Sequence, residues 1–378
     1  MSLSNTRVAL LTITALLATS ACGGNGAVPS NAVTAGNAGL QASGSGITPD
    51  DNTSILKKLT KDVVIGSTVD PKNGDMAPHS LVVASANYGL KKGDLLVCNY
   101  EDSSGTAGNG TSIEVLADKP GSKPKTFAQS SLMKGCDGNA ITSGNQTYAI
   151  GASGTGLVPI DQKGKVGKVI GPITAPFANG DAYPGGLYTP EDVFTSDSTG
   201  HIFSIGLGNY GQKKLIEVAK GFDVNGKTGW SELDAAGFAY YPKKDVLYIT
   251  DGVDNTVVAF SHASNLLEKD EIVVEKGGKT FKCLHAQTTC GSLVLAGSPL
   301  NAPEAAAILP NGNLVVANTA GGNTLVELTP TGTVLDTEVV DTSKTQGIYG
   351  IVATGTNDTN TRIFFSDVNG NNVQELEP

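Results

Sequence analysis

The sequence predicts an all-β fold built from repeated small antiparallel sheets. Charged residues make up 16% of the 378 residues, below the roughly 25% that is usual for globular proteins. The chain also contains 48 glycines, well above the average share of about 7%. Few charges and many turn-forming residues favour short strands joined by tight turns. A pattern of apolar strands separated by such turns recurs at a spacing of roughly 45–67 residues, as expected of a repeat fold.

The clearest copy of this pattern begins at Asn301. A short apolar strand is followed by a Pro-Asn-Gly turn, and a second apolar strand ends at Asn318. A glycine-rich turn then leads to a third strand at residues 324–328. Three short antiparallel strands joined by tight turns form a meander.

Five further copies follow the same pattern. Their first strands begin near Pro78, Asp137, Pro190, Ala235 and Ile348. Their second strands are expected at residues 93–99, 147–150, 201–205, 246–250 and 362–366. One copy is too small to bury both of its faces, so the copies must stack on one another. Sheets of about four strands arranged around an axis achieve this and leave only short edges. We therefore predict a six-bladed β-propeller, with five or seven blades as alternatives.

The ends of the chain suggest how the ring closes. A strand-like segment at residues 55–67 precedes the first copy, whereas the last copy ends after its third strand at residues 373–376. We expect the N-terminal segment to supply the missing outer strand of the last blade. Segments such as residues 165–170 and 271–275 are expected to be fourth strands of other blades.

The first 21 residues read as an export signal. Arg7 is followed by an apolar run at residues 8–18, which is shorter than the roughly 20 residues needed to span a bilayer. The stretch from Leu16 to Cys22 resembles the bacterial lipobox, which implies that Cys22 is lipidated and becomes the mature N-terminus. Thr19 stands where leucine is usual in that motif. Ordinary signal-peptidase cleavage after Ala21 is therefore the alternative.

Residues 22–51 read as the lipidated cysteine and a disordered tether, and residues 52–378 as the propeller. The tether contains mainly Gly, Ala, Ser, Asn and Thr, so it cannot bury enough apolar surface to fold. These features predict a protein of the cell envelope, lipid-anchored and either periplasmic or surface-exposed, that meets the membrane only through its lipid. Removal of Arg7 changes the net charge from −10 to −11, which argues against nucleic acid as a partner.

The cysteines of the mature chain predict two disulfides. Without Cys22, four cysteines remain, an even number that suits an oxidising compartment. Cys283 and Cys290 flank a short polar loop and are expected to pair, which leaves Cys98 with Cys136. The alternative for Cys98 is a free thiol buried in an apolar strand. The chain has no CxxC spacing, so neither a zinc site nor thioredoxin-type chemistry is expected.

The last three copies resemble a known repeat family. Their second strands end in Asp or Asn, followed by a short turn with Asn and then a third apolar strand, as in Asn318-x4-Asn323-x-Leu325, Asp251-x2-Asp254-Asn255-x-Val257 and Asp367-x3-Asn371-Asn372-Val373. This pattern resembles the NHL-repeat propellers over roughly residues 75–378, whereas the copy at about 137–165 is degenerate.

The resemblance implies the architecture and says little about activity. Related lactonase propellers hold a metal with Glu, Asn and Asp at the axial mouth, and some NHL propellers are metal-dependent lyases. Neither catalytic motif matches this sequence residue by residue, so no catalytic residue is assigned.

The repeat geometry gathers polar residues on one face. First strands begin and second strands end on the same side of each sheet, because neighbouring strands are antiparallel. The first-strand starts supply His79, Glu191, Glu304 and Tyr349, and the second-strand ends supply Asn99, Asp251, Asn318 and Asp367. Oxygen ligands suit a divalent cation such as calcium, so we take His79, Glu191 and Glu304 as candidate metal ligands or bases.

Each candidate also has a structural explanation. Asp and Asn at strand ends commonly bond the backbone of their own turn, and the two glutamates could be solvated carboxylates at the rim. Trp230, the only tryptophan, could pack between blades or form a stacking site.

Two hypotheses of function follow. In the first, the protein is an exported binding or scaffold module for a protein, peptide or glycan partner. In the second, it is a metal-assisted hydrolase or lyase that uses the axial mouth. Clustering of the two glutamates with His79 would favour the second hypothesis, and a mouth filled by apolar side chains or by a loop would oppose it.

Overall fold

The computed structural model describes residues 51–173, 176–177, 192–206, 214–343 and 345–378. The predicted signal peptide, Cys22 and most of the predicted tether lie outside the described residues. Within them, no helix is long and apolar enough to cross a membrane. The helices of the described part are short 3-10 turns, η1 (Leu56–Lys58), η2 (Ser131–Met133), η3 (Gly229–Ser231) and η4 (Ala263–Asn265).

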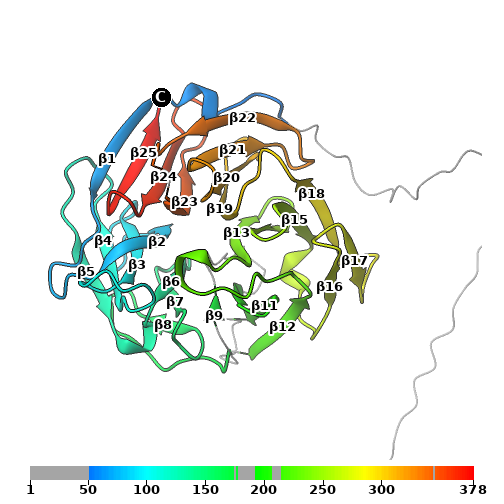
Figure 1. Cartoon of the computed structure of the whole chain (residues 1–378), viewed down its shortest axis with the longest axis horizontal. Coiled ribbons are helices and arrows are strands. Elements are labelled where there is room, and N and C mark those ends of the chain that lie inside the picture. Colours follow the sequence, from blue (N-terminus) through cyan, green and yellow to red (C-terminus); the bar gives the residue numbers. More distant parts are fainter. Residues whose placement is uncertain (1–50, 174–175, 178–191, 207–213, 344) are drawn as a thin grey trace, which may run out of the picture. The chain divides into compact units, whose positions relative to one another are not determined.

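Six sheets of the described part stand around a central axis, so the protein is a six-bladed β-propeller, as predicted (Figure 1). Blade 1 contains β2 (Met76–Val83), β3 (Leu95–Glu101), β4 (Ser112–Leu116) and β5 (Lys125–Gln129). Blade 2 contains β6 (Cys136–Ile141), β7 (Thr147–Gly151) and β8 (Val158–Ile160). Blade 3 contains β9 (Pro176–Phe177), β10 (Asp192–Asp197), β11 (His201–Gly206), β12 (Lys214–Lys220), β16 (Ile272–Glu275) and β17 (Thr280–Cys283). Blade 4 contains β13 (Ala235–Tyr241), β14 (Val246–Asp251), β15 (Thr256–Ser261) and β18 (Gly291–Ala296). Blade 5 contains β19 (Pro303–Ile308), β20 (Leu314–Asn318), β21 (Thr324–Leu328) and β22 (Val334–Val339). Blade 6 contains β23 (Ile348–Thr354), β24 (Arg362–Asp367), β25 (Asn372–Glu377) and β1 (Lys61–Ser67).

The two ends of the propeller meet in blade 6. β1 pairs antiparallel with β25, from Lys61 opposite Glu377 to Ser67 opposite Asn372. The N-terminal segment therefore supplies the outer strand of the last blade, as predicted. This pairing leaves no seam in the ring, because the first and last strands share one hydrogen-bonded ladder.

A buried carboxylate fixes the residues that precede β1. Both oxygens of Glu327, in β21, accept hydrogen bonds from this segment: the Ile55 N–H at 3.2 Å, the Leu56 N–H at 2.8 Å and the Ser54 hydroxyl at 2.8 Å. Asn313 donates a fourth bond at 3.0 Å. The side chains of Ile55 and Leu56 are buried in the core shared by blades 5 and 6. We call residues 54–59 the N-terminal latch.

Blade 3 differs from the prediction in strand order. The strand after Pro190 was expected to be innermost, but β10 pairs on its axial side with the two-residue strand β9 and on its other side with β11. β10 is therefore the second strand of its blade and β11 the third. The sequence pattern misled because β9 contains only two residues, too few to show an apolar strand pattern.

The outer strands of blades 2 and 4 also differ from the prediction. Residues 271–275 were expected to complete a four-stranded blade, but β16 joins blade 3 and runs parallel to its outer strand β12. After β15 the chain departs from blade 4 to form the hairpin β16–β17. It then returns as β18, which pairs with β15 and is the fourth strand of blade 4. Residues 165–170 make only isolated bridges with the segment at β8, between Ile160 and Val166 and between Leu157 and Ile170.

Apolar side chains fill the spaces between successive blades. The second strands are the most completely buried elements, because both of their faces contact neighbouring sheets. The two predicted disulfides are present: Cys98–Cys136 joins β3 of blade 1 to β6 of blade 2, and Cys283–Cys290 closes the loop after β17. The alternative of a free Cys98 thiol is therefore wrong.

Candidate functional site

The innermost strands share one irregularity at their start. In five blades the register of the first strand shifts there, between Pro78 and Leu81, Cys136 and Gly138, Ala235 and Phe238, Pro303 and Ala305, and Ile348 and Ile351. Such bulges re-aim side chains at the rim of a sheet. The bulged residues include His79, Asp137, Glu304 and Tyr349. The repeat therefore brings a histidine, two carboxylic acids and a tyrosine to one axial mouth.

His79 lies at the centre of this mouth. Its Nδ1 contacts Oδ1 of the Asp137 carboxyl group, and both side chains are buried, at 5% and 1% exposure. The imidazole is stacked between two tyrosine rings. Its centroid lies 4.8 Å from that of Tyr100, at an interplanar angle of 24°, and 4.2 Å from that of Tyr349, at 19°. Blades 1, 2 and 6 thus converge on one imidazole ring.

Trp230 covers this stack. It belongs to η3, in the segment between β12 and β13 that reaches the centre of the ring (Figure 1). Its ring centroid lies 5.4 Å from that of His79, 4.9 Å from Tyr100 and 5.2 Å from Tyr349. The indole Nε1 donates a hydrogen bond of 2.7 Å to Glu101 Oε1. Trp230 therefore packs over the axial mouth rather than between two blades.

The surroundings of the mouth are acidic. Burial raises the pKa of Tyr100, and the carboxylates of Asp137, Glu232 and Glu101 raise it further. Burial, with Glu304 as the next cause, likewise raises the pKa of Tyr349. Burial and then Asp137 raise the pKa of Glu232 to about 7. The negative charges of several carboxyl groups therefore raise the pKa values of the two tyrosines at the mouth.

The free space at the mouth is small. The free volume at the mouth is about 10 Å³, and it is bordered by Gly229 and by six side chains that we call the mouth cluster: His79, Tyr100, Asp137, Trp230, Glu232 and Tyr349. Sites for drug-sized ligands usually have about 300–1,000 Å³. In this conformation the mouth has room for a group about the size of one water molecule.

The predicted candidates lie in three different situations. His79 and Tyr349 are in contact, as the strand-start rule predicts. Glu304 is fully buried at the start of β19 and acts electrostatically on Tyr349. Glu191 lies outside the described residues. The strand after it, β10, is second in its blade, so the end of β10 at Asp197, rather than its start, corresponds to the mouth-facing second-strand ends.

The residues at the second-strand ends form hydrogen bonds within and between loops. Asp251 Oδ1 accepts from the Val253 N–H at 2.9 Å, and Asp367 Oδ1 accepts from the Gly370 N–H at 3.0 Å. Asn318 accepts from the Asn301 N–H, and Asn99 donates to the Thr68 carbonyl. The turn explanation therefore holds for both aspartates, and the two asparagines bridge to neighbouring loops.

A metal site at the mouth remains a prediction. Among the residues that the structure describes, no group of three or more His, Cys, Asp or Glu side chains is placed to hold a metal ion. The candidate set of His79, Glu191 and Glu304 is not tested by this result, because Glu191 is not among those residues.

The sequence reasoning missed three members of the mouth cluster. Asp137 was recognised as the beginning of a copy, and its position equivalent to His79 could have identified it. Tyr100 directly follows Asn99 and could have been noted as a ring next to a mouth residue. Glu232 lies in a segment without a periodic pattern, so no sequence signal placed it at the axis.

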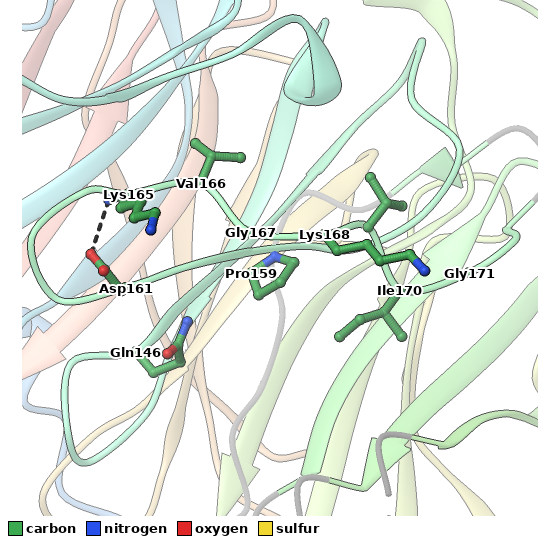
Figure 2. A pocket seen from close by; sticks show the side chains of 10 residues that line it. Gln146, Pro159, Asp161, Lys165, Val166, Gly167, Lys168, Ile170 and Gly171 are labelled. Atoms are coloured by element: carbon green, nitrogen blue, oxygen red, sulfur yellow. Dashed lines mark hydrogen bonds between the residues drawn. The ribbon is translucent and has the colours of Figure 1, made fainter. Parts of the chain in front are cut away.

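Two further features lie away from the mouth. A shallow hollow on blade 2 is lined by residues of and near β8, with Lys165 beside Asp161 and Lys168 farther along the same segment, near Ile170 (Figure 2). There Asp161 Oδ1 accepts a hydrogen bond of 2.9 Å from the backbone N–H of Lys165.

In blade 1, burial and then Asp70 raise the pKa of Glu114 to about 9. Glu114 is fully buried in β4.

The ring of six sheets and the side chains gathered at its axis define a β-propeller protein with a closed aromatic mouth. No protein-family model matches the sequence, and no curated protein shows significant similarity to it. Among solved structures, a gluconolactonase from Xanthomonas campestris aligns with a TM-score of 0.52 at 11% identity, over 84% of this chain and 89% of that one. A luciferin-regenerating enzyme aligns with a TM-score of 0.52 at 10% identity, over 84% and 95%.

A nidogen/laminin complex contains a chain that aligns with a TM-score of 0.51 at 11% identity, over 75% of this chain and 87% of that one. At such low identity these similarities establish the fold alone. They confirm the propeller that the NHL resemblance implied, and the NHL repeat itself stays a prediction.

Proposed function

We propose that the protein is an exported, lipid-anchored binding module of the cell envelope that takes its ligand at the axial mouth. One observation carries the proposal: the side chains that converge on the mouth form a stack of aromatic rings around a His79–Asp137 pair, covered by Trp230. Aromatic side chains supply much of the binding energy at recognition sites, because they bury large area at low entropic cost. The segment that carries Trp230 also closes the mouth, which opposes an open catalytic cleft.

The single tryptophan makes the proposal testable. Fluorescence of the intact protein reports on Trp230 alone, so occupation of the mouth should change the emission. Peptides, oligosaccharides and small amines would be titrated in parallel, with calorimetry as a second readout. We expect at least one class to bind, and Tyr349→Ala to weaken that binding.

Tyr88→Ala provides the matched control. Tyr88 is 62% exposed and lies in the loop after β2, on the side opposite the mouth. Binding by none of the three classes, or equal loss in the two tyrosine variants, would refute a binding function at the mouth.

The second candidate function is a metal-assisted hydrolase or lyase. Its support is that His79 and Glu304 both start first strands at the same mouth, and that a structurally similar protein is a gluconolactonase. His79 and Glu304 would then contribute ligands to a divalent cation such as calcium, whereas Glu191 of the predicted set lies outside the described residues.

Metal analysis of the purified protein before and after chelation, with a thermal melt of each sample, separates the two functions. A binding module should contain no stoichiometric divalent ion, and chelator should not change its melting temperature. Stoichiometric metal that disappears in Glu304→Gln, together with turnover of a lactone, would establish the second function instead.

A further inference from the structure

The chemistry of the mouth cluster narrows the class of ligand. Two of its members, Asp137 and Glu232, are carboxylic acids, and three are aromatic rings, Tyr100, Trp230 and Tyr349. Among the residues that the structure describes, no lysine or arginine lines this space. Aromatic faces and carboxylates both attract cations, the first through the ring quadrupole and the second through charge.

Further carboxylates strengthen the negative field from outside the enclosed space. Glu101 accepts a hydrogen bond from the indole N–H of Trp230, and its negative charge raises the pKa of Tyr100. Glu304 acts on Tyr349 from the start of β19. The chain as a whole is also acidic, with a net charge of −10. A positively charged group would therefore be attracted to the mouth.

The size of the space distinguishes between cations. Room for about one water molecule matches a primary ammonium group, which is of similar size. A quaternary ammonium group or a guanidinium group is larger and would need the ring of Trp230 to move. An ammonium group also has three N–H donors, which suits a space lined by the two acidic residues Asp137 and Glu232.

His79 contributes to this arrangement as a positioning residue. Its imidazole keeps the rings of Tyr100 and Tyr349 apart, at centroid distances of 4.8 and 4.2 Å. Its Nδ1 holds one side of the Asp137 carboxylate. Trp230 covers the stack and lines the same space as Glu232.

We infer that the axial mouth binds the primary ammonium group of an amine, with the Asp137 and Glu232 carboxylates as acceptors and the Trp230 ring against its alkyl chain. This inference rests on the proposed binding function and names its ligand class. The ammonium group could belong to a free small amine or to a lysine side chain of a partner protein, because both present the same chemistry.

The test uses n-butylamine as the probe and n-butanol as its uncharged match. Emission of Trp230 and calorimetric heat of the intact protein are recorded for both compounds. We expect butylamine to bind and butanol not to bind. We expect Glu232→Gln, which keeps the shape and removes the charge, to weaken butylamine binding by about 10- to 100-fold, the loss of one charge-assisted hydrogen bond. Glu338→Gln on the exposed face of β22 should leave the affinity unchanged.

A second arm distinguishes the sources of the ammonium group. A short peptide that contains one lysine is compared with the same peptide carrying Nε-acetyl-lysine. Tighter binding of the free lysine peptide than of butylamine points to a partner protein, and tighter binding of butylamine points to a free amine; both support the ammonium site.

Equal binding of butylamine and butanol, or unchanged affinity in Glu232→Gln, overturns the inference. If a glycan or an acetylated peptide changes the Trp230 emission while amines do not, the ligand class is wrong and the binding function stands. If no compound of any class binds, both fall together.

Discussion

Replacement of Glu327 by glutamine should release the N-terminal latch. The carboxylate of Glu327 is fully buried and accepts four hydrogen bonds, three of them from residues 54–56. Glutamine has nearly the same shape but only one acceptor oxygen. In either orientation of its amide, one backbone N–H of the latch faces an NH₂ group and loses its partner.

The expected cost follows from these contacts. A hydrogen bond to a charged group contributes about 1.5–3 kcal/mol, and a buried donor left without a partner costs about 1–3 kcal/mol. We therefore expect Glu327→Gln to lower the free energy of unfolding by about 2–4 kcal/mol. If the latch detaches fully, the loss grows, because Ile55, Leu56 and Leu59 are buried at 0%, 1% and 5% exposure and each contributes roughly 1.5–3 kcal/mol.

Two measurements test this reasoning. Urea unfolding gives the change in free energy, with Glu268→Gln on the exposed loop before β16 as the control. Hydrogen exchange locates the change: the amides of Ile55 and Leu56 should lose protection, whereas the amides of the buried strand β20 should keep theirs. Unchanged protection of the two latch amides in Glu327→Gln would refute the latch, whatever the free energy does.

Two further predictions concern buried carboxyl groups and disulfides. Burial raises the pKa of Glu114 from 4.5 to about 9, so the folded protein keeps a proton that the unfolded chain releases. The free energy of unfolding should therefore fall as the pH rises from about 4.5 to about 9. Urea titrations at several pH values should show a flatter slope for Glu114→Gln. An unaltered slope would mean that Glu114 is ionised in the folded protein. Chain entropy assigns about 4 kcal/mol to Cys98–Cys136, which spans 38 residues, and about 2 kcal/mol to Cys283–Cys290, which spans 7. Paired serine variants should show this order in denaturant midpoints, and the reverse order would contradict a mainly entropic effect.

The sequence was sufficient to predict the ring and its closure. The repeat determines the sheets locally, because each meander is formed by strands that follow one another in the chain. The incomplete last copy and the extra segment before the first copy then leave one economical arrangement. The disulfides could be predicted for a similar reason, since Cys283 and Cys290 are only seven residues apart.

The errors in blade 3 come from interactions that are not local. The hairpin β16–β17 pairs with β12 across more than fifty residues, with Ala219 opposite Ile272. No periodicity in the sequence distinguishes a hairpin that stays in its own blade from one that extends the neighbouring blade. The strand β9 has only two residues, and such a strand acquires its role solely from its partner.

The candidate site could be predicted in part. The strand-start rule identified His79 and Tyr349, because it follows from antiparallel pairing alone. It did not predict that Asp137 pairs with His79, which depends on the bulges that turn both residues toward the axis. The position of Trp230 depends on a segment whose path is set by its tertiary contacts rather than by any pattern of its own.

The pairing of β1 with β25 has a consequence for how the chain could be rearranged. Lys61 at the start of β1 lies opposite Glu377 at the end of β25, so a short turn between them would make the two strands an ordinary hairpin. A circular permutant joined there could begin at the exposed turn around Gly121, between β4 and β5, and would lack the residues before Lys61, including the latch. The closing ladder would then move from blade 6 to blade 1, and every sheet would keep the same strands. The order in which the blades are encoded is thus one of several that this ring permits.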